Sequence, residues 1–246
     1  MNYDWVLFDA DGTLFDYDAA EGEALGRTLM TFGLPPGPRI LEIYRQINGR
    51  LWREFEQGKT TAGRLKVARF ALLFEALEAD HDAGRRSLKR PDPARFGRSY
   101  LQHLGQCAHL IPDAELVLQA LEDRVRLALI TNGLSTVQRS RLAKSDLGRY
   151  FAAVVISDEE GVAKPDPRIF DVVFARMDQP SKEAVLMVGD SLTSDIQGAA
   201  RYGIDACWFN PEARLPDSDV AFRYEIRQLR ELLPIVDQTA DPGGRA

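Results

Sequence analysis

Three short apolar runs, far apart in the chain, each end in a polar segment, and this arrangement restricts the fold more than any other feature. Residues 5–8 (WVLF) run into DADGT, residues 127–130 (LALI) into TNG, and residues 184–188 (AVLMV) into GD. Short continuous apolar runs are typical of strands buried on both faces of a parallel sheet. Because such sheets bind ligands outside the carboxyl ends of their strands, we expect the polar segments to share one cleft.

Strand and helix patterns alternate after residue 112, which predicts an α/β fold with a doubly wound parallel sheet. We expect strands at 5–9, 126–130, 152–156, 184–188 and 205–209, and helices at 113–123, 136–147, 167–176 and 194–202. Asp166 before Pro167 is a typical helix start, and Ser135 is the expected N-cap of the helix at 136–147.

Residues 17–109 show helical periodicity instead, with patterns at 19–32, 40–56 and 94–108. A further helix is predicted from an apolar stripe of Val67, Phe70, Ala71, Phe74 and Leu77. We therefore expect a small helical cap at 17–109, inserted above the strand ends of an α/β core formed by 1–16 and 110–236. The tail 237–246 is expected to be disordered.

Composition excludes several kinds of protein. A net charge of −6 argues against binding to a nucleic-acid polymer, which needs clustered cations. No run approaches the ~18 apolar residues of a membrane span, and no secretory signal precedes the first strand. We expect a cytoplasmic protein, a monomer or homodimer, in which Cys107 and Cys207 are reduced core thiols.

Asp9 and Asp11 follow the first predicted strand directly. Side chains two residues apart on a strand point to the same side, about 6–7 Å apart, so both carboxylates can face one reacting group. Nucleophilic phosphoryl transfer needs an attacking oxygen and a proton donor for the leaving oxygen. We assign Asp9 as the nucleophile and Asp11 as the general acid and later base. Taken alone, the two residues could also be turn formers before Gly12.

Asp190 and Asp195 form a second acidic group after the strand at 184–188. Together with Asp9 they suit a hard cation such as Mg²⁺, or alternatively Mn²⁺, which prefers oxygen ligands and bridges to phosphate oxygens. Taken alone, Asp190 could end the strand and Asp195 could cap the next helix. Ser191 and Ser194 are interpreted as loop residues that hydrogen-bond locally.

Thr131, Asn132 and Gly133 can present a hydroxyl and successive backbone N–H groups to a phosphate near a helix start. Lys164 has no obvious partner in the sequence, and most such lysines are solvated. It follows a strand and precedes a capped helix start, so we expect it to neutralise the phosphoryl oxygens and Asp9.

With these segments in view, the chain resembles the haloacid dehalogenase superfamily of phosphohydrolases. DADGTLF, ITNG, the lysine of GVAKPDPRIF, and GDSLTSD are similar to its four signature motifs and occur in the same order. The resemblance implies that Asp9 is phosphorylated and binds metal, and that Asp11 is the acid/base with its backbone carbonyl on the metal. It implies that Thr131 and Lys164 bind phosphate and that Asp190 and Asp195 complete the metal site.

Longer stretches, such as VVISDEEGVAKPDPRIFD, resemble bacterial pyrimidine 5′-nucleotidases, which implies a phosphatase for nucleoside 5′-monophosphates. Gly12 departs from some of these enzymes, which carry an acidic residue at this position. The alternative is a phosphatase or mutase for sugar phosphates or phosphoglycolate. A phosphoacceptor signalling module has no use for a helical lid or a leaving-group acid such as Asp11.

Overall fold

The computed structural model describes residues 3–79, 90–216 and 220–237. Six strands form one wholly parallel sheet in the order β3-β2-β1-β4-β5-β6. The strands are β1 (Trp5–Phe8), β2 (Arg126–Thr131), β3 (Ala153–Ile156), β4 (Val185–Gly189), β5 (Asp205–Phe209) and β6 (Tyr224–Ile226). The order reverses at β1, so the β1 carboxyl end lies at the centre of the ligand-binding edge.

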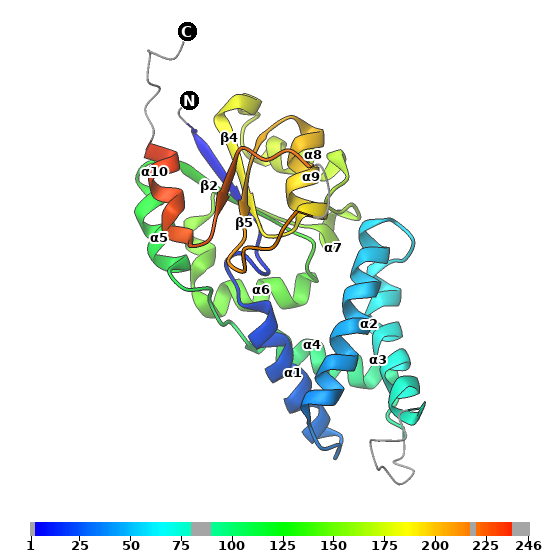
Figure 1. The fold of residues 1–246 in the computed structure, drawn as a ribbon. Helices are drawn as coiled ribbons and strands as arrows, with labels where there is room; N and C mark the ends of the chain where they lie inside the picture. The colour runs from blue at the N-terminus through cyan, green and yellow to red at the C-terminus, as the bar shows by residue number, and fades with distance from the viewer. Residues whose placement is uncertain (1–2, 80–89, 217–219, 238–246) are drawn as a thin grey trace.

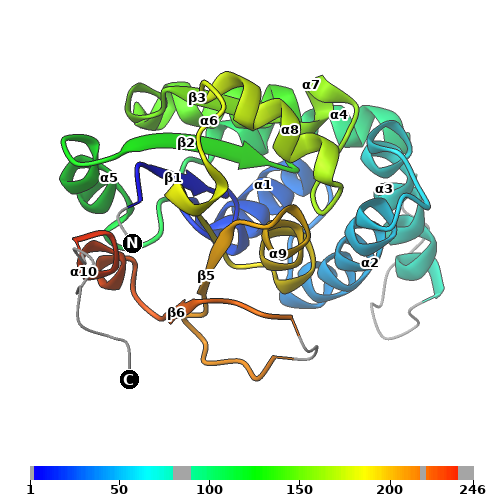
Figure 2. The same cartoon turned by 90° about the horizontal axis from the view of Figure 1, so that it is seen from above.

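Helices cover both faces of the sheet, as the burial of all four β1 residues requires. They are α5 (Ala114–Glu122), α6 (Ser135–Ser145), α7 (Ser157–Glu160), α8 (Pro167–Arg176), α9 (Gln197–Tyr202) and α10 (Leu232–Asp237). Val6 and Phe8 of β1 face one apolar cluster with α5 and α10, whereas Trp5 and Leu7 face another with α8 and α9. The predicted fold class is confirmed. Figure 2 shows α5 and α10 together on one side of the molecule.

Four helices stand over the carboxyl ends of the strands (Figure 1). They are α1 (Tyr17–Thr31), α2 (Pro38–Glu56), α3 (Ala62–Ala79) and α4 (Pro93–Gln106). Their apolar cluster is rich in aromatic rings and also takes in Leu134 and Val137 from α6. Because the cap shares side chains with the core, the division at residues 16 and 110 stays a proposal.

The two linkers between sheet and cap run side by side. The Asp16 N–H donates to the His109 carbonyl, and the Ile111 N–H donates to the Leu14 carbonyl. Both donor–acceptor distances are 2.9 Å. At the far edge of the cap, Lys66 pairs with Asp158 of α7 at 3.2 Å. The cap is therefore joined to the core at a hydrogen-bonded hinge and by polar contacts at the opposite edge.

Several expected details differ from the structure. β1 ends at Phe8, one residue early, and α6 ends at Ser145. The apolar stripe of α3 is rotated, because Val67 is 39% exposed while Leu65 and Leu73 are fully buried. The sequence did not predict β6 or α10. With three and six residues, each element gives too short a pattern to recognise. The predicted tail starts at Asp237, which ends α10, and 238–246 lie outside the described residues.

Two predicted helix starts are also informative. Asp166 caps α8 as expected, accepting the Arg168 N–H. Ser135 is not an N-cap, since α6 begins at Ser135 itself and the Asp158 carboxylate accepts its N–H at 3.1 Å. A cap supplied by a distant segment satisfies the same unpaired N–H group, but local sequence cannot reveal it.

Candidate active site

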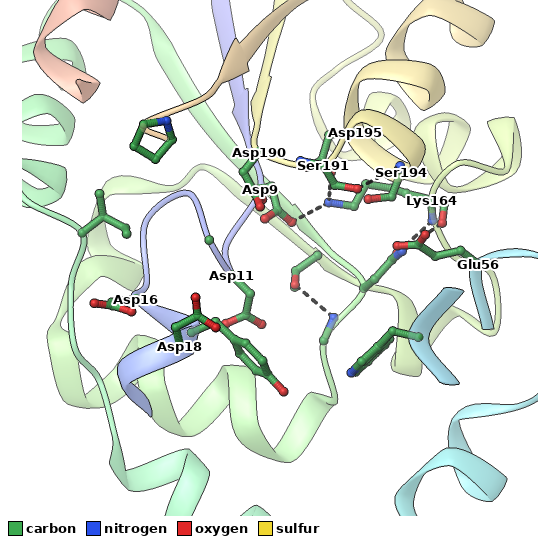
Figure 3. A pocket seen from close by; sticks show the side chains of 18 of the residues that line it. Asp9, Asp11, Asp16, Asp18, Glu56, Lys164, Asp190, Ser191, Ser194 and Asp195 are labelled. Carbon is green, nitrogen blue, oxygen red and sulfur yellow. Dashed lines mark hydrogen bonds and ion pairs between the residues drawn. The ribbon is translucent and has the colours of Figure 1, made fainter. Parts of the chain in front are cut away.

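A cavity of about 450 Å³ opens where β1, β2 and β4 end beneath the cap (Figure 3). Its lining includes all eight residues predicted for the site: Asp9, Asp11, Thr131, Asn132, Gly133, Lys164, Asp190 and Asp195. The parallel sheet explains this convergence, because neighbouring strands deliver the residues that follow them to one edge. Their chemical roles remain predictions.

Three carboxylates at this edge could hold a metal ion. Ligand oxygens from Asp9, Asp190 and Asp195 all lie within 4.8 Å of one another. The Asp11 carboxylate does not belong to this cluster; the contribution to a metal expected from Asp11 is its backbone carbonyl. A cluster of carboxylate oxygens is the donor set that Mg²⁺ selects, so the residues fit the expected cation.

The pKa values of two carboxyl groups in the cluster are raised. Burial raises the pKa of Asp9 well above its usual value; Lys164 opposes this effect, and the charges of Asp195 and Asp190 add to it. Burial, and next the charge of Asp195, raise the pKa of Asp190 to about 7. Desolvation is the main physical cause, and repulsion among like charges adds to it; a divalent cation would favour the ionised forms.

Close packing at two glycines makes room for these carboxylates. Gly12 has φ +86°, and a Cβ there would meet the Asp190 carboxylate at 2.6 Å. A Cβ on Gly189 would collide with the Asp195 side chain. Both positions therefore need glycine. At Gly12, where some nucleotidases carry an acidic residue, a side chain would collide with the Asp190 carboxylate in this protein.

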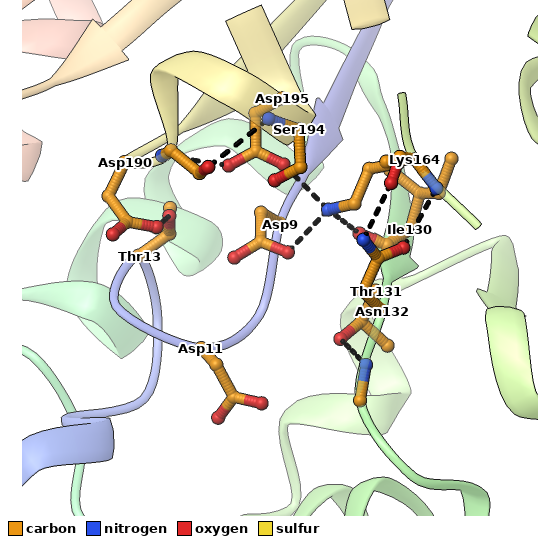
Figure 4. Close-up of polar contacts among 12 residues, drawn as sticks. Asp9, Asp11, Thr13, Ile130, Thr131, Asn132, Lys164, Asp190, Ser194 and Asp195 are labelled. Carbon is orange, nitrogen blue, oxygen red and sulfur yellow. Dashed lines mark hydrogen bonds and ion pairs between the residues drawn. The ribbon is translucent and has the colours of Figure 1, made fainter. Parts of the chain in front are cut away.

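Lys164 lies at the centre of the site, as Figure 4 shows. Its Nζ is 2.5 Å from Asp9 Oδ1, 2.7 Å from Asp195 Oδ1 and 2.8 Å from the Ile130 carbonyl. Burial acts to lower the pKa of this ammonium, but Asp195 and Asp9 outweigh it and the pKa is raised. The sequence led us to expect Lys164 beside Asp9, and the structure places its Nζ beside both Asp9 and a second carboxylate, Asp195.

The segment after β2 is positioned by hydrogen bonds to itself and to Lys164. The Thr131 hydroxyl accepts the Gly133 N–H at 3.0 Å. The Asn132 amide donates to the Lys164 carbonyl at 2.9 Å and accepts the Lys164 N–H at 2.8 Å. The Asn132 side chain thus fixes the lysine backbone, which leaves the backbone N–H as the donor that Asn132 could offer a phosphate. The Gly133 N–H would first have to leave the Thr131 hydroxyl.

Asp11 is held from α6, a contact that the sequence did not indicate. Gln138 Nε2 donates to its Oδ2 at 2.5 Å, and the Arg141 guanidinium pairs with its Oδ1. The premise that Asp9 and Asp11 share one strand face is wrong, since β1 ends at Phe8 and Asp11 lies in the following turn. To reach a leaving oxygen over Asp9, the Asp11 side chain must exchange these partners, as catalytic groups often do on substrate binding.

The cap contributes side chains that sequence reasoning did not assign to the site. Trp52 and Glu56 of α2 line the cavity, together with Tyr17 of α1. Glu56 accepts the Thr193 hydroxyl at 3.0 Å, close to the metal cluster. Two neighbours of Trp52 on α2 do not reach this cavity: Asn48 is buried against Glu21, and Phe55 lines a different cavity.

Ser191 behaves as expected, because its hydroxyl accepts the Ser194 N–H at 3.2 Å and caps the following turn. Asp195 does not cap that helix; its carboxylate accepts the Ser191 N–H at 3.0 Å and faces Lys164. Both cysteines are free and buried, as predicted. No helix within the described part of the chain has the length and apolar character of a membrane span.

Comparison with known proteins agrees with this geometry. Residues 3–203 match the family model of the haloacid dehalogenase-like hydrolases. The chain belongs to this family. The prediction of a phosphatase of the haloacid dehalogenase family is confirmed.

Three relatives place the chain within the family. It is 32% identical to pyrimidine 5′-nucleotidase YjjG of Escherichia coli, covering 94% of this chain and 97% of that one. It is 33% identical to pyrimidine 5′-nucleotidase PynA of Streptococcus pneumoniae, covering 97% of both. The crystal structure of the HAD-hydrolase YfnB from Bacillus subtilis, bound to magnesium, aligns with a TM-score of 0.87 at 34% identity, over 97% of this chain and 100% of that one.

Proposed function

We propose that this protein is a Mg²⁺-dependent phosphatase that hydrolyses pyrimidine nucleoside 5′-monophosphates through an aspartyl-phosphate on Asp9. The observation that carries the proposal is the make-up of the cavity lining. Lys164 and the three clustered carboxylates line the cavity together with the aromatic side chains Trp52 and Tyr17. The lysine and the carboxylates suit a phosphate with its cation, and the rings suit a neutral aromatic group.

The core residues divide the work as follows. Asp9 attacks phosphorus, and Lys164 compensates the charge of Asp9 before attack and of the phosphoryl oxygens during it. Asp11 leaves Gln138 and Arg141 and protonates the departing 5′-oxygen; it then takes a proton from the water that hydrolyses the aspartyl-phosphate. Mg²⁺ held by Asp9, Asp190, Asp195 and the Asp11 carbonyl would supply positive charge to the phosphoryl oxygens.

The lining of the cavity favours a neutral leaving group. Asp16, Asp18, Glu56 and Glu212 also line the cavity, against one further lining cation besides Lys164, Arg214. A second phosphate or a carboxylate on the leaving group would face these charges, and like-charge juxtaposition is costly. A nucleoside carries no such charge, and its base can stack on Trp52. This argues against phosphoglycolate and sugar bisphosphates, and the similarity to two named pyrimidine nucleotidases points the same way.

A phosphomonoester panel with Asp9→Asn tests the reaction. With Mg²⁺ present, we expect the wild-type protein to release phosphate from UMP and dUMP at a higher kcat/KM than from ribose 5-phosphate or phosphoglycolate. Asp9→Asn should reduce turnover at least ~10³-fold, because the nucleophile is lost. Asp178→Asn, at an exposed carboxylate paired with Arg126, is the matched control and should be unaffected. Wild-type turnover by Asp9→Asn would refute the mechanism.

Trp52→Leu tests the contact with the leaving group separately. Stacking of a base on an aromatic ring contributes about 1–3 kcal/mol, so the KM for UMP should rise ~10-fold or more. The KM for ribose 5-phosphate, which has no base, should change little. Phe32→Leu, at the C-cap of α1 and outside the cavity lining, is the control. Equal effects on both substrates would mean that Trp52 does not contact a base, and the sugar-phosphate alternative would then be favoured.

A further inference from the structure

A second group of metal-binding side chains lies at the hinge between core and cap, and none of its members lines the cavity. Glu23 of α1, Cys107 at the end of α4 and His109 in the returning linker offer ligand atoms that all lie within 4.8 Å of one another. We propose that these three side chains bind a thiophilic divalent cation such as Zn²⁺, and that the bound cation restrains α1 against the segment that returns from the cap to the core.

The donor set differs in kind from that of the carboxylate cluster. A thiolate, an imidazole and a carboxylate suit Zn²⁺, whereas Mg²⁺ prefers oxygen ligands alone. Zn–ligand distances of about 2.0–2.3 Å place two donors on one tetrahedral ion roughly 3.3–3.6 Å apart. His109 Nε2 is 2.7 Å from Glu23 Oε2, so this pair needs to open slightly to admit the cation. Three protein donors leave a fourth position for water.

The surroundings leave the site open to solvent on one side. The side chains of Glu23 and His109 are 42% and 45% exposed, while Cys107 is buried behind them. Arg27 contacts the other Glu23 oxygen, Oε1, at 3.4 Å, which leaves Oε2 directed at His109. Burial raises the pKa of the Cys107 thiol, and the Glu23 charge adds to this effect. Binding of the cation would therefore release the thiol proton.

The position of the site connects it to the two linkers and to Asp11. The His109 carbonyl accepts the Asp16 N–H across the two linkers. The Cys107 carbonyl accepts Arg141 Nε at 3.0 Å, and the same guanidinium pairs with the Asp11 carboxylate. A cation bound here would tie α1 to the returning linker and to the backbone that holds Arg141. We expect turnover to fall when the site is occupied.

Cobalt spectroscopy tests the binding site directly. Co²⁺ is added to full-length, chelator-treated protein in excess Mg²⁺, and the thiolate-to-cobalt charge-transfer band is recorded. Wild-type protein and Cys207→Ser should show the band, and Cys107→Ser should not. His109→Asn and Glu23→Gln, both at exposed positions, should weaken Co²⁺ binding at least tenfold even if Cys107→Ser folds poorly. A band that is absent from the wild type, or unaffected by His109→Asn, would overturn the proposal.

Inhibition by Zn²⁺ tests the effect of this restraint. In excess Mg²⁺, low Zn²⁺ should reduce phosphate release by the wild type several-fold more than by His109→Asn, whose substitution lies outside the cavity. Any phosphomonoester that the enzyme cleaves serves for this assay, so the result does not depend on the nucleotide assignment. Equal inhibition of both proteins would place the Zn²⁺ effect at the carboxylate cluster and refute the restraint.

Discussion

Among the described residues, the core buries the cations Lys164 and Arg141 and the cap buries Arg69, and Lys164 and Arg69 are stabilised in opposite ways. Lys164 in the core has two carboxylates and a carbonyl within 2.8 Å of its Nζ. Arg69 in the cap has one long hydrogen bond, from Nη1 to Asn48 Oδ1 at 3.4 Å. Its guanidinium carbon lies instead 5.0 Å and 4.9 Å from the ring centres of Phe70 and Tyr100.

The difference shows what each region is built to do. In the core, strand ends hold ionic groups at contact distance, which suits groups that must stabilise charge on a reacting phosphate. In the cap, a cation among aromatic rings contributes mainly packing and cation–π attraction, while Nε and Nη2 of Arg69 have no hydrogen-bond partner among the described residues. The core supplies the clustered carboxylates and Lys164 of the cavity, and the cap supplies part of its wall.

The largest effect should come from Lys164→Met. Removing the ammonium leaves Asp9 and Asp195 buried without their cation, which costs about 3–5 kcal/mol of unfolding free energy when a buried pair is broken. Loss of a charge-stabilising group at the reacting phosphate should lower kcat about 10²–10³-fold. Steady-state kinetics and urea unfolding measure the two effects. A wild-type kcat in this variant would show that Lys164, like Arg69, does not act on the reacting phosphate.

The pH dependence of Mg²⁺ stabilisation should be an intermediate effect. Without metal, the pKa of Asp190 is about 7, above its value of about 3.9 in an unfolded chain. Between these values the folded protein holds a proton that the unfolded chain has released, so stability falls as pH rises from about 4 to about 7.

Mg²⁺ competes with that proton, so its stabilisation should grow as pH rises through about 7. Thermal unfolding with Mg²⁺ or with a chelator, at pH 6 and pH 8, measures the difference. Asp190→Asn should reduce the growth, because its amide does not titrate, and the remainder should come from Asp9, whose pKa is also raised. An equal Mg²⁺ shift at both pH values in the wild type would show that Asp190 does not couple cation and proton.

The smallest effect should come from Arg69→Met. Glu21, the nearby carboxylate, keeps Arg45 at 3.1 Å and the Asn48 amide at 2.8 Å, so no buried charge is left alone. Apolar replacements of buried charges are often neutral or stabilising, and the unfolding free energy should change by less than about 1 kcal/mol. Urea unfolding beside Lys164→Met gives the comparison. A loss as large as that of Lys164→Met would show that Arg69 also acts as an ionic centre.

Short-range patterns account for the expectations that the structure agrees with. The apolar runs before Asp9, Thr131 and Asp190 predicted three neighbouring parallel strands, because burial on both faces demands continuous apolar sequence. The cap on Asp166 is likewise local. The errors have physical causes of their own: Val67 is exposed because α3 packs on a rotated face, and the Asp158 carboxylate replaced the expected Ser135 cap.

The amino-acid sequence by itself determined the α/β fold class, the insertion of helices after the first strand, and eight of the residues that line the cavity. Tertiary structure alone decided that Lys164 lies between Asp9 and Asp195, that Gln138 and Arg141 hold Asp11, and that Trp52 reaches the cavity. The reason is the range of the interactions. Periodicity and capping act over a few neighbouring residues, whereas these contacts join segments up to 155 positions apart, which only the packed sheet and cap bring together.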